Sequence, residues 1–197
     1  IALSISCSQD GENGATFDAM ANGDGQGGSL ARFTLRGDYL YTVDEYGLNV
    51  FNITTPSDPV LVNNVPISFR IETLFNYKDY LYVGSQNGMF IYSINNPSTP
   101  SFISNFAHAG ACDPVFVDGD LAYVTLRSGS VCEGFNNQLD VVDISNPSQP
   151  SLLKTYKMDN PHGLEKYAII GSDQTPCLGQ TSSMTHWSHL GALAVQV

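Results

Sequence analysis

The sequence predicts an all-β fold: a partial β-propeller of about three four-stranded blades, followed by an irregular C-terminal tail. Three observations predict it, namely a repeat of 41 residues, short apolar runs rich in Tyr, Val, Ile and Phe, and turn residues that bound each run. Asp38, Asp79 and Asp120 occupy one repeat position at that spacing. Because no stretch shows the three-and-four apolar spacing of a helix, we expect strands throughout.

Each repeat is expected to form four strands. The first strands are expected near residues 30–35, 71–76 and 113–117. The second strands follow a Gly-Asp or Lys-Asp turn, and the third strands end at Ile53, Ile94 and Ile144. A Pro-Ser-x-Pro turn then leads to fourth strands at 60–62, 102–103 and 152–153. Proline suits that corner because it cannot donate a hydrogen bond to a central strand.

The second strands carry apolar residues on both faces. Tyr41, Tyr82 and Tyr123 share one face, and the neighbouring positions 40, 81 and 122 are Leu, Leu and Ala on the other. A sheet that is apolar on both faces must be covered on both, which favours blades stacked around an axis. A β-sandwich is the alternative, although sandwiches seldom repeat a sequence so regularly.

Residues 139–144, Leu-Asp-Val-Val-Asp-Ile, followed by Ser-Asn-Pro at 145–147, resemble the LVIVD-repeat family, and the resemblance extends over residues 29–164. It implies β-propellers in bacterial surface or periplasmic proteins that mostly lack an assigned activity. The resemblance therefore specifies the fold well and the function poorly.

Residues 1–7 form a short apolar and small-residue run that ends in Cys7, which is typical of a lipoprotein signal peptide. Residues 8–28 are acidic and Gly-rich, so we expect a flexible tether. Such a stretch after a lipidated cysteine resembles surface-exported lipoproteins of the Bacteroides kind. We therefore expect Cys7 to carry lipid on an outer-membrane lipoprotein, at the cell surface or in the periplasm. The alternative is an ordinary free cysteine in a frayed terminus.

The net charge of −11 argues against two classes of partner. A nucleic-acid-binding protein needs a basic stripe to displace counterions. Anionic lipid surfaces likewise attract basic segments. We expect no nucleic-acid partner, and contact with the membrane through the lipid anchor only.

The third repeat carries a nine-residue insertion in the hairpin at residues 128–137, which contains Cys132. Cys112 stands at the head of the same repeat's first strand. We expect the two to form a disulfide in an exported protein, and two reduced thiols in a cytosolic one.

Residues 165–197 lack both turn motifs, so we expect no fourth blade like the others there. The tail is an unrelated cap, a disordered segment or a frame-shifted end. Because three blades are too few to close a propeller, we expect the chain to be a fragment.

Four charged or polar residues near the starts of the first strands are candidates for the mouth of the channel: Arg32, Glu72, Asp113 and His162. Together they would grip a polar ligand such as a sugar or a peptide; the alternative is a solvated rim. We expect no cofactor and no metal, because His186 with His189, and His108 with Cys112, offer too few ligands.

Two functions remain open. The first is a non-catalytic, anchored propeller that binds a protein or polysaccharide partner. The second is a propeller hydrolase or lyase whose main catalytic groups lie in missing blades. Three or more carboxylates or histidines converging in the channel would favour the enzyme. The sequence offers fewer at a suitable depth, so we favour binding.

Overall fold

A computed structural model of the chain describes residues 31–67, 70–108, 114–127, 137–159, 161, 163–166 and 193–196. Blade 1 consists of β1 (Phe33–Arg36), β2 (Tyr39–Val43), β3 (Gly47–Asn52) and β4 (Val60–Pro66). Blade 2 consists of β5 (Ile71–Tyr77), β6 (Tyr80–Ser85), β7 (Gly88–Ser93) and β8 (Ser101–Ala107). Blade 3 consists of β9 (Val115–Asp118), β10 (Leu121–Leu126), β11 (Gln138–Asp143) and β12 (Ser151–Lys157).

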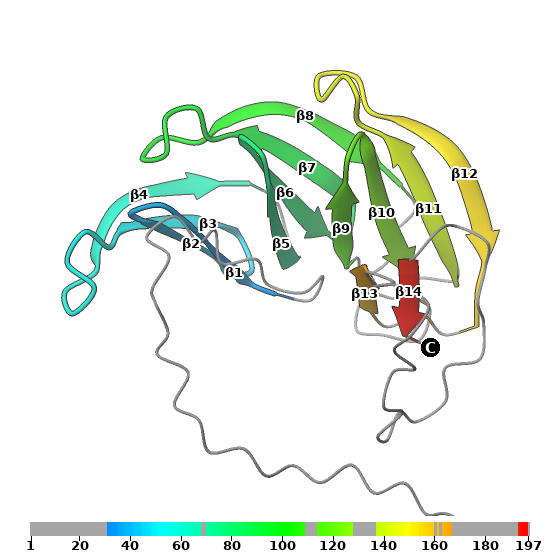
Figure 1. Cartoon of the computed structure of the whole chain (residues 1–197), viewed down its shortest axis with the longest axis horizontal. Coiled ribbons are helices and arrows are strands. Elements are labelled where there is room, and N and C mark those ends of the chain that lie inside the picture. Colours follow the sequence, from blue (N-terminus) through cyan, green and yellow to red (C-terminus); the bar gives the residue numbers. More distant parts are fainter. Residues whose placement is uncertain are drawn as a thin grey trace, which may run out of the picture.

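Each blade is an antiparallel sheet whose four strands lie side by side in sequence order. The three sheets fan out as an arc, with β1, β5 and β9 on the inside and β4, β8 and β12 on the outside (Figure 1). The innermost strands of successive blades contact one another. This is a partial β-propeller of three blades, as the sequence predicts, and the part of the chain that the structure describes contains no helix.

Two apolar seams hold the arc together. The first seam, between blades 1 and 2, joins the face of blade 1 that carries Tyr41 and Val50 to the face of blade 2 that carries Leu81. The second seam, between blades 2 and 3, joins the opposite face of blade 2, with Tyr82 and Ile91, to blade 3. Blade 2 is therefore buried on both faces, which confirms the two-sided apolar pattern read from the sequence.

A β-bulge recurs at one position in all three blades, between the third and fourth strands. The extra residues are Val62, Ile103 and Leu153, which have no partner in the register. A bulge bends and twists its strand locally, and it makes an edge a poorer template for another strand. The bulges therefore protect β4, β8 and β12, whose outer sides face no neighbouring strand within the described structure.

The fourth strands are longer than the sequence pattern indicates, extending to Pro66, Ala107 and Lys157. Their later residues mix polar and apolar side chains because these strands are mostly exposed, so alternation is a poor guide to where they end. The third strands end one residue earlier than expected, at Asn52, Ser93 and Asp143.

Blade 1 has one face turned away from blade 2. Phe33 lies on that face and is 56 % exposed, whereas Leu74, at the same position in the repeat, is 1 % exposed inside the first seam. Burial at this repeat position therefore comes from the preceding blade and not from the sheet itself.

After blade 3 the chain forms a two-stranded antiparallel sheet from β13 (Gly163–Lys166) and β14 (Leu193–Gln196). β13 continues the inner row and contacts β9 and β10. The sequence predicts no fourth blade like the others in residues 165–197, and its pattern does not indicate β14. The signal was a short alternation of Leu193, Val195 and Val197, too brief to be told from chance.

Candidate functional site

The starts of β1 and β5 meet at one end of the first seam. The backbone N–H of Leu74 donates to the carbonyl of Ala31 at 2.8 Å, and the N–H of Ile71 donates to the carbonyl of Glu45 at 3.3 Å. These bonds place Arg32, which directly precedes β1, beside the first residues of strand β5. Two of the four residues predicted for the channel mouth, Arg32 and Glu72, are thereby brought together.

Arg32 spans the seam. Its Nη2 donates to the carbonyl of Ile71 at 2.9 Å, so the guanidinium is held next to the residue that precedes Glu72. The Arg32 residue is otherwise exposed. A guanidinium has five N–H donors in a fixed fork, so this single bond leaves the group able to bind a further acceptor.

Glu72 is the extra residue of a second kind of bulge. In the β5–β6 register Ile71 pairs with Ser85 and Thr73 with Gly84, and Glu72 falls between them. The described ladders of blades 1 and 3 begin later in the repeat, at Phe33 and Val115. Bulges re-aim a side chain and are common beside functional sites.

Three arginines act electrostatically on the half-buried Glu72 carboxylate. Burial raises the pKa of Glu72 above its ordinary value, and the positive charges of Arg32, Arg127 and Arg70 oppose that rise. These arginines come from the start of β1, the end of β10 and the residue before β5. All three blades thus contribute to one cluster, here called the mouth cluster: Arg32, Arg70, Glu72 and Arg127.

The sequence reading missed Arg70 and Arg127. Arg70 has a positive φ of 55°, and its carbonyl accepts a hydrogen bond from the N–H of Gln86 at 3.2 Å, so its backbone is fixed by blade 2 itself. Both residues stand at strand ends on the same end of the blades as Arg32. Their position at strand ends was the sequence signal that could have identified them. The signal is weak, because the repeat does not place an arginine at one fixed position.

Asp44 lies close to the mouth cluster but has a structural task. Its Oδ1 accepts hydrogen bonds from the backbone N–H groups of Tyr46 at 2.8 Å and Gly47 at 3.0 Å. Asn49 donates to its Oδ2 at 3.1 Å. These bonds lower the pKa of Asp44, with a small contribution from Arg32. Asp44 therefore stabilises the β2–β3 turn as a carboxylate.

The other predicted residues lie outside the described residues: Asp113, His162, Cys112, Cys132 and Cys7. Their roles stay predictions. Within the described ranges, no group of three or more His, Cys, Asp or Glu side chains is arranged to hold a metal ion. No helix in this part of the chain is long and apolar enough to cross a membrane.

Stacked four-stranded sheets with an inner row of first strands define a propeller-type repeat protein. The chain belongs to the LVIVD repeat family: the family model matches residues 27–66, 76–108 and 109–158, more than half of the sequence. This confirms the family that the motif at residues 139–147 resembles. No curated protein matches the chain.

Proposed function

We propose that the chain is a non-catalytic β-propeller protein that binds a protein or polysaccharide partner through the mouth cluster. One observation carries the proposal: the bulge at Glu72 sets its carboxylate among Arg32, Arg70 and Arg127 from three blades. Ligand sites commonly lie where several structural elements converge, as three blades do at this cluster.

The charge of the mouth cluster favours a partner that carries carboxylates. Three guanidiniums face one half-buried carboxylate, so the cluster is locally positive in a chain whose net charge is −11. Arginine binds carboxylates through paired hydrogen bonds, and such charged pairs strengthen where water is partly excluded. Uronic-acid polysaccharides and acidic peptide segments both offer this chemistry.

The alternative, a propeller hydrolase or lyase, draws on the raised pKa of Glu72, which is a property of catalytic acids and bases. We favour binding because the arginines around Glu72 can hold a ligand without a second reacting group. Turnover of a bound polysaccharide, and its loss in Glu72→Gln, would support the enzyme instead.

The test measures binding of trigalacturonate and of a hexaglutamate peptide by isothermal calorimetry. We expect one of them to bind, and Arg32→Ala to weaken it about tenfold or more, since a charged hydrogen bond contributes about 1.5–3 kcal/mol. Lys154→Ala, which removes an exposed cation on β12, is the matched control and should bind as the wild type does. Failure of both probes, or equal loss in both variants, would contradict the proposal.

The proposed location is the bacterial outer membrane, with the propeller at the cell surface or in the periplasm and Cys7 carrying the lipid. The support is the apolar run before Cys7 and the acidic, Gly-rich stretch that follows it. Labelling of cells with radioactive palmitate should mark the wild type and not Cys7→Ala, and the variant should leave the membrane fraction. Equal labelling of the wild type and Cys7→Ala would contradict the proposal that Cys7 carries the lipid.

A further inference from the structure

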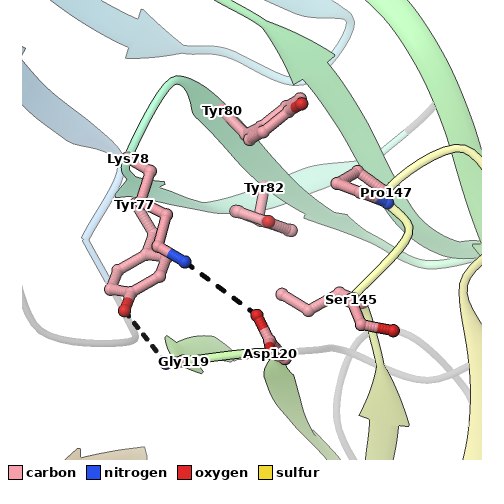
Figure 2. Close-up of a pocket in the computed structure, with 9 residues that line it drawn as sticks. Tyr77, Lys78, Tyr80, Tyr82, Gly119, Asp120, Ser145 and Pro147 are labelled. Carbon is pink, nitrogen blue, oxygen red and sulfur yellow. Dashed lines mark hydrogen bonds and ion pairs between the residues drawn. The ribbon is translucent and has the colours of Figure 1, made fainter.

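A cavity of about 170 Å³ opens in the second seam, at the opposite end of the blades from the mouth cluster. It lies between the β5–β6 turn of blade 2 and the β9–β10 turn and β11–β12 loop of blade 3. Its lining includes Tyr77, Lys78, Tyr80, Tyr82 and Asp120 (Figure 2). We call it the seam cavity. Neither the repeat nor the mouth cluster accounts for it.

In the first seam, the tyrosine at the same repeat position has a hydrogen-bond partner for its hydroxyl. There Tyr41, the counterpart of Tyr82, donates its hydroxyl hydrogen to the carbonyl of Pro97 at 2.8 Å. The neighbouring Asn63 donates to the next carbonyl, that of Ser98, at 3.1 Å. The two donors of blade 1 therefore use two different acceptors of blade 2.

The second seam distributes these bonds differently. Ser104 replaces Asn63, and its shorter side chain donates to the carbonyl of Pro147, the counterpart of Pro97. Among the residues that the structure describes, the Tyr82 hydroxyl then has no hydrogen-bond partner. Figure 2 shows the Tyr82 side chain between Lys78 and Pro147, within the lining of the cavity.

Tyr82 is only 2 % exposed, and it is one of the residues that line the cavity. Burial raises the pKa of Tyr82 well above its ordinary value, so the hydroxyl keeps its proton at neutral pH. A tyrosine hydroxyl can both donate and accept a hydrogen bond, so a polar ligand in the cavity can bond to it. The cavity therefore contains a fixed donor and acceptor that is ready for a polar ligand.

A charged pair stands at the opening. Lys78 Nζ lies 3.9 Å from Asp120 Oδ1, beyond hydrogen-bond distance, and both side chains are more exposed than buried. Figure 2 shows this pair beside the bond in which the N–H of Gly119 donates to the Tyr77 hydroxyl at 3.0 Å. One hydroxyl group of a ligand would accept from Lys78 and donate to Asp120, because it can do both.

We propose that the seam cavity binds one neutral hexose unit of a glycan. The charges of Lys78 and Asp120 cancel, so the cavity favours a ligand without net charge. Hydroxyl groups of a sugar match Tyr82, Lys78 and Asp120, and the C–H face of a sugar ring packs against tyrosine rings such as Tyr80. The volume of about 170 Å³ limits the ligand to a single ring.

The test uses methyl glycosides of glucose, galactose and mannose as probes in saturation-transfer NMR titrations against the whole chain. We expect at least one glycoside to bind in the millimolar range, which is about −4 kcal/mol. Tyr82→Phe keeps the buried ring and removes only the hydroxyl, and it should weaken binding about fivefold to tenfold. Asp120→Asn should weaken it as well.

Tyr41→Phe is the matched control, because that hydroxyl already belongs to Pro97 in the other seam, and its affinity should equal that of the wild type. Arg32→Ala should also leave glycoside binding unchanged, so failure of the mouth cluster and failure of the seam cavity can be told apart. Absence of binding of all three glycosides, or equal affinity in Tyr82→Phe and the wild type, would overturn the inference.

Discussion

The first and second seams have the same apolar packing and different polar contacts. Across the first seam, the described residues provide contacts of Arg32 with the Ile71 carbonyl, Arg36 with Asp79 at 3.1 Å, Tyr41 with the Pro97 carbonyl and Asn63 with the Ser98 carbonyl. Across the second, the described residues provide the bonds of Ser104 and of Gly119 and the wider pair of Lys78 with Asp120.

The difference shows that the apolar packing and the polar contacts are determined by different positions of the repeat. Tyr, Leu, Val and Ile recur at fixed positions because every seam needs them. The polar partners change with single residues, such as Asn63 in one blade and Ser104 in the next. A one-residue change in an outer strand is thus enough to free a hydroxyl at a buried position.

The largest effect should come from apolar burial. Leu74→Ala should lower the free energy of unfolding by about 3 kcal/mol, because Leu74 is buried in the first seam and the substitution leaves a void. Phe33→Ala, at the same repeat position on the exposed face of blade 1, should cost less than about 1 kcal/mol. Urea denaturation of both variants measures this, and similar losses would show that Phe33 is covered by something in solution.

The hydroxyl groups give the next comparison. Tyr41→Phe should destabilise by about 1 kcal/mol, because it removes the donor to Pro97 and leaves that carbonyl without the bond. Tyr82→Phe should change stability by less than about 0.5 kcal/mol, since its hydroxyl makes no such bond. If thermal or urea unfolding shows equal losses, the second seam must be bonded as the first is.

Lys78 is a third test, with the opposite sign. Its φ of 53° matches those of Gly37 at 53° and Gly119 at 62°, which occupy the same turn in blades 1 and 3. A residue with a Cβ pays about 1 kcal/mol in this left-handed region. Lys78→Gly should therefore raise the free energy of unfolding by somewhat less than about 1 kcal/mol, because glycine loses more entropy on folding. A clear loss of stability would show that the Lys78 side chain strengthens the second seam.

The ion pairs should differ by less. Asp79→Asn should cost about 0.5 kcal/mol at low ionic strength, and the cost should vanish near 1 M NaCl, because Arg36 and Asp79 are close but partly exposed. Asp120→Asn should cost nothing measurable, since its partner Lys78 is farther away and both are well exposed. Salt titration of the unfolding midpoints separates the two. Equal salt dependence would remove this distinction between the seams.

Glu72 should give the smallest effect on stability. Burial raises its pKa above the ordinary 4.5, so the native chain holds this proton more tightly than the unfolded chain does. The ionised carboxylate therefore lowers stability near neutral pH, and this cost disappears as the pH falls below 4.5. Glu72→Gln should raise the melting temperature relative to the wild type more at neutral pH than in acid. The reverse order would mean that the arginines outweigh burial.

The fold could be predicted because the repeat fixes it: turns, proline corners and two-sided apolar strands recur with one spacing. Arg32 and Glu72 could be placed at one end of the blades for the same reason. Three features could not be predicted from the sequence: the bulge at Glu72, the two further arginines and the Tyr82 hydroxyl. They depend on contacts between blades that no local sequence pattern shows. Asp113, His162 and the Cys112–Cys132 disulfide stay predictions, since they lie outside the described residues.

The sheet topology has a consequence for how the chain folds during synthesis. Each blade consists of four consecutive strands, so it needs only the chain of its own repeat to complete its ladders. Contacts that are local in sequence form quickly and require little loop closure. Blade 1 can therefore assemble while blade 2 is still inside the ribosome, and each new blade meets a finished surface on which to dock. We therefore expect the blades to assemble in the order of their repeats, starting with blade 1.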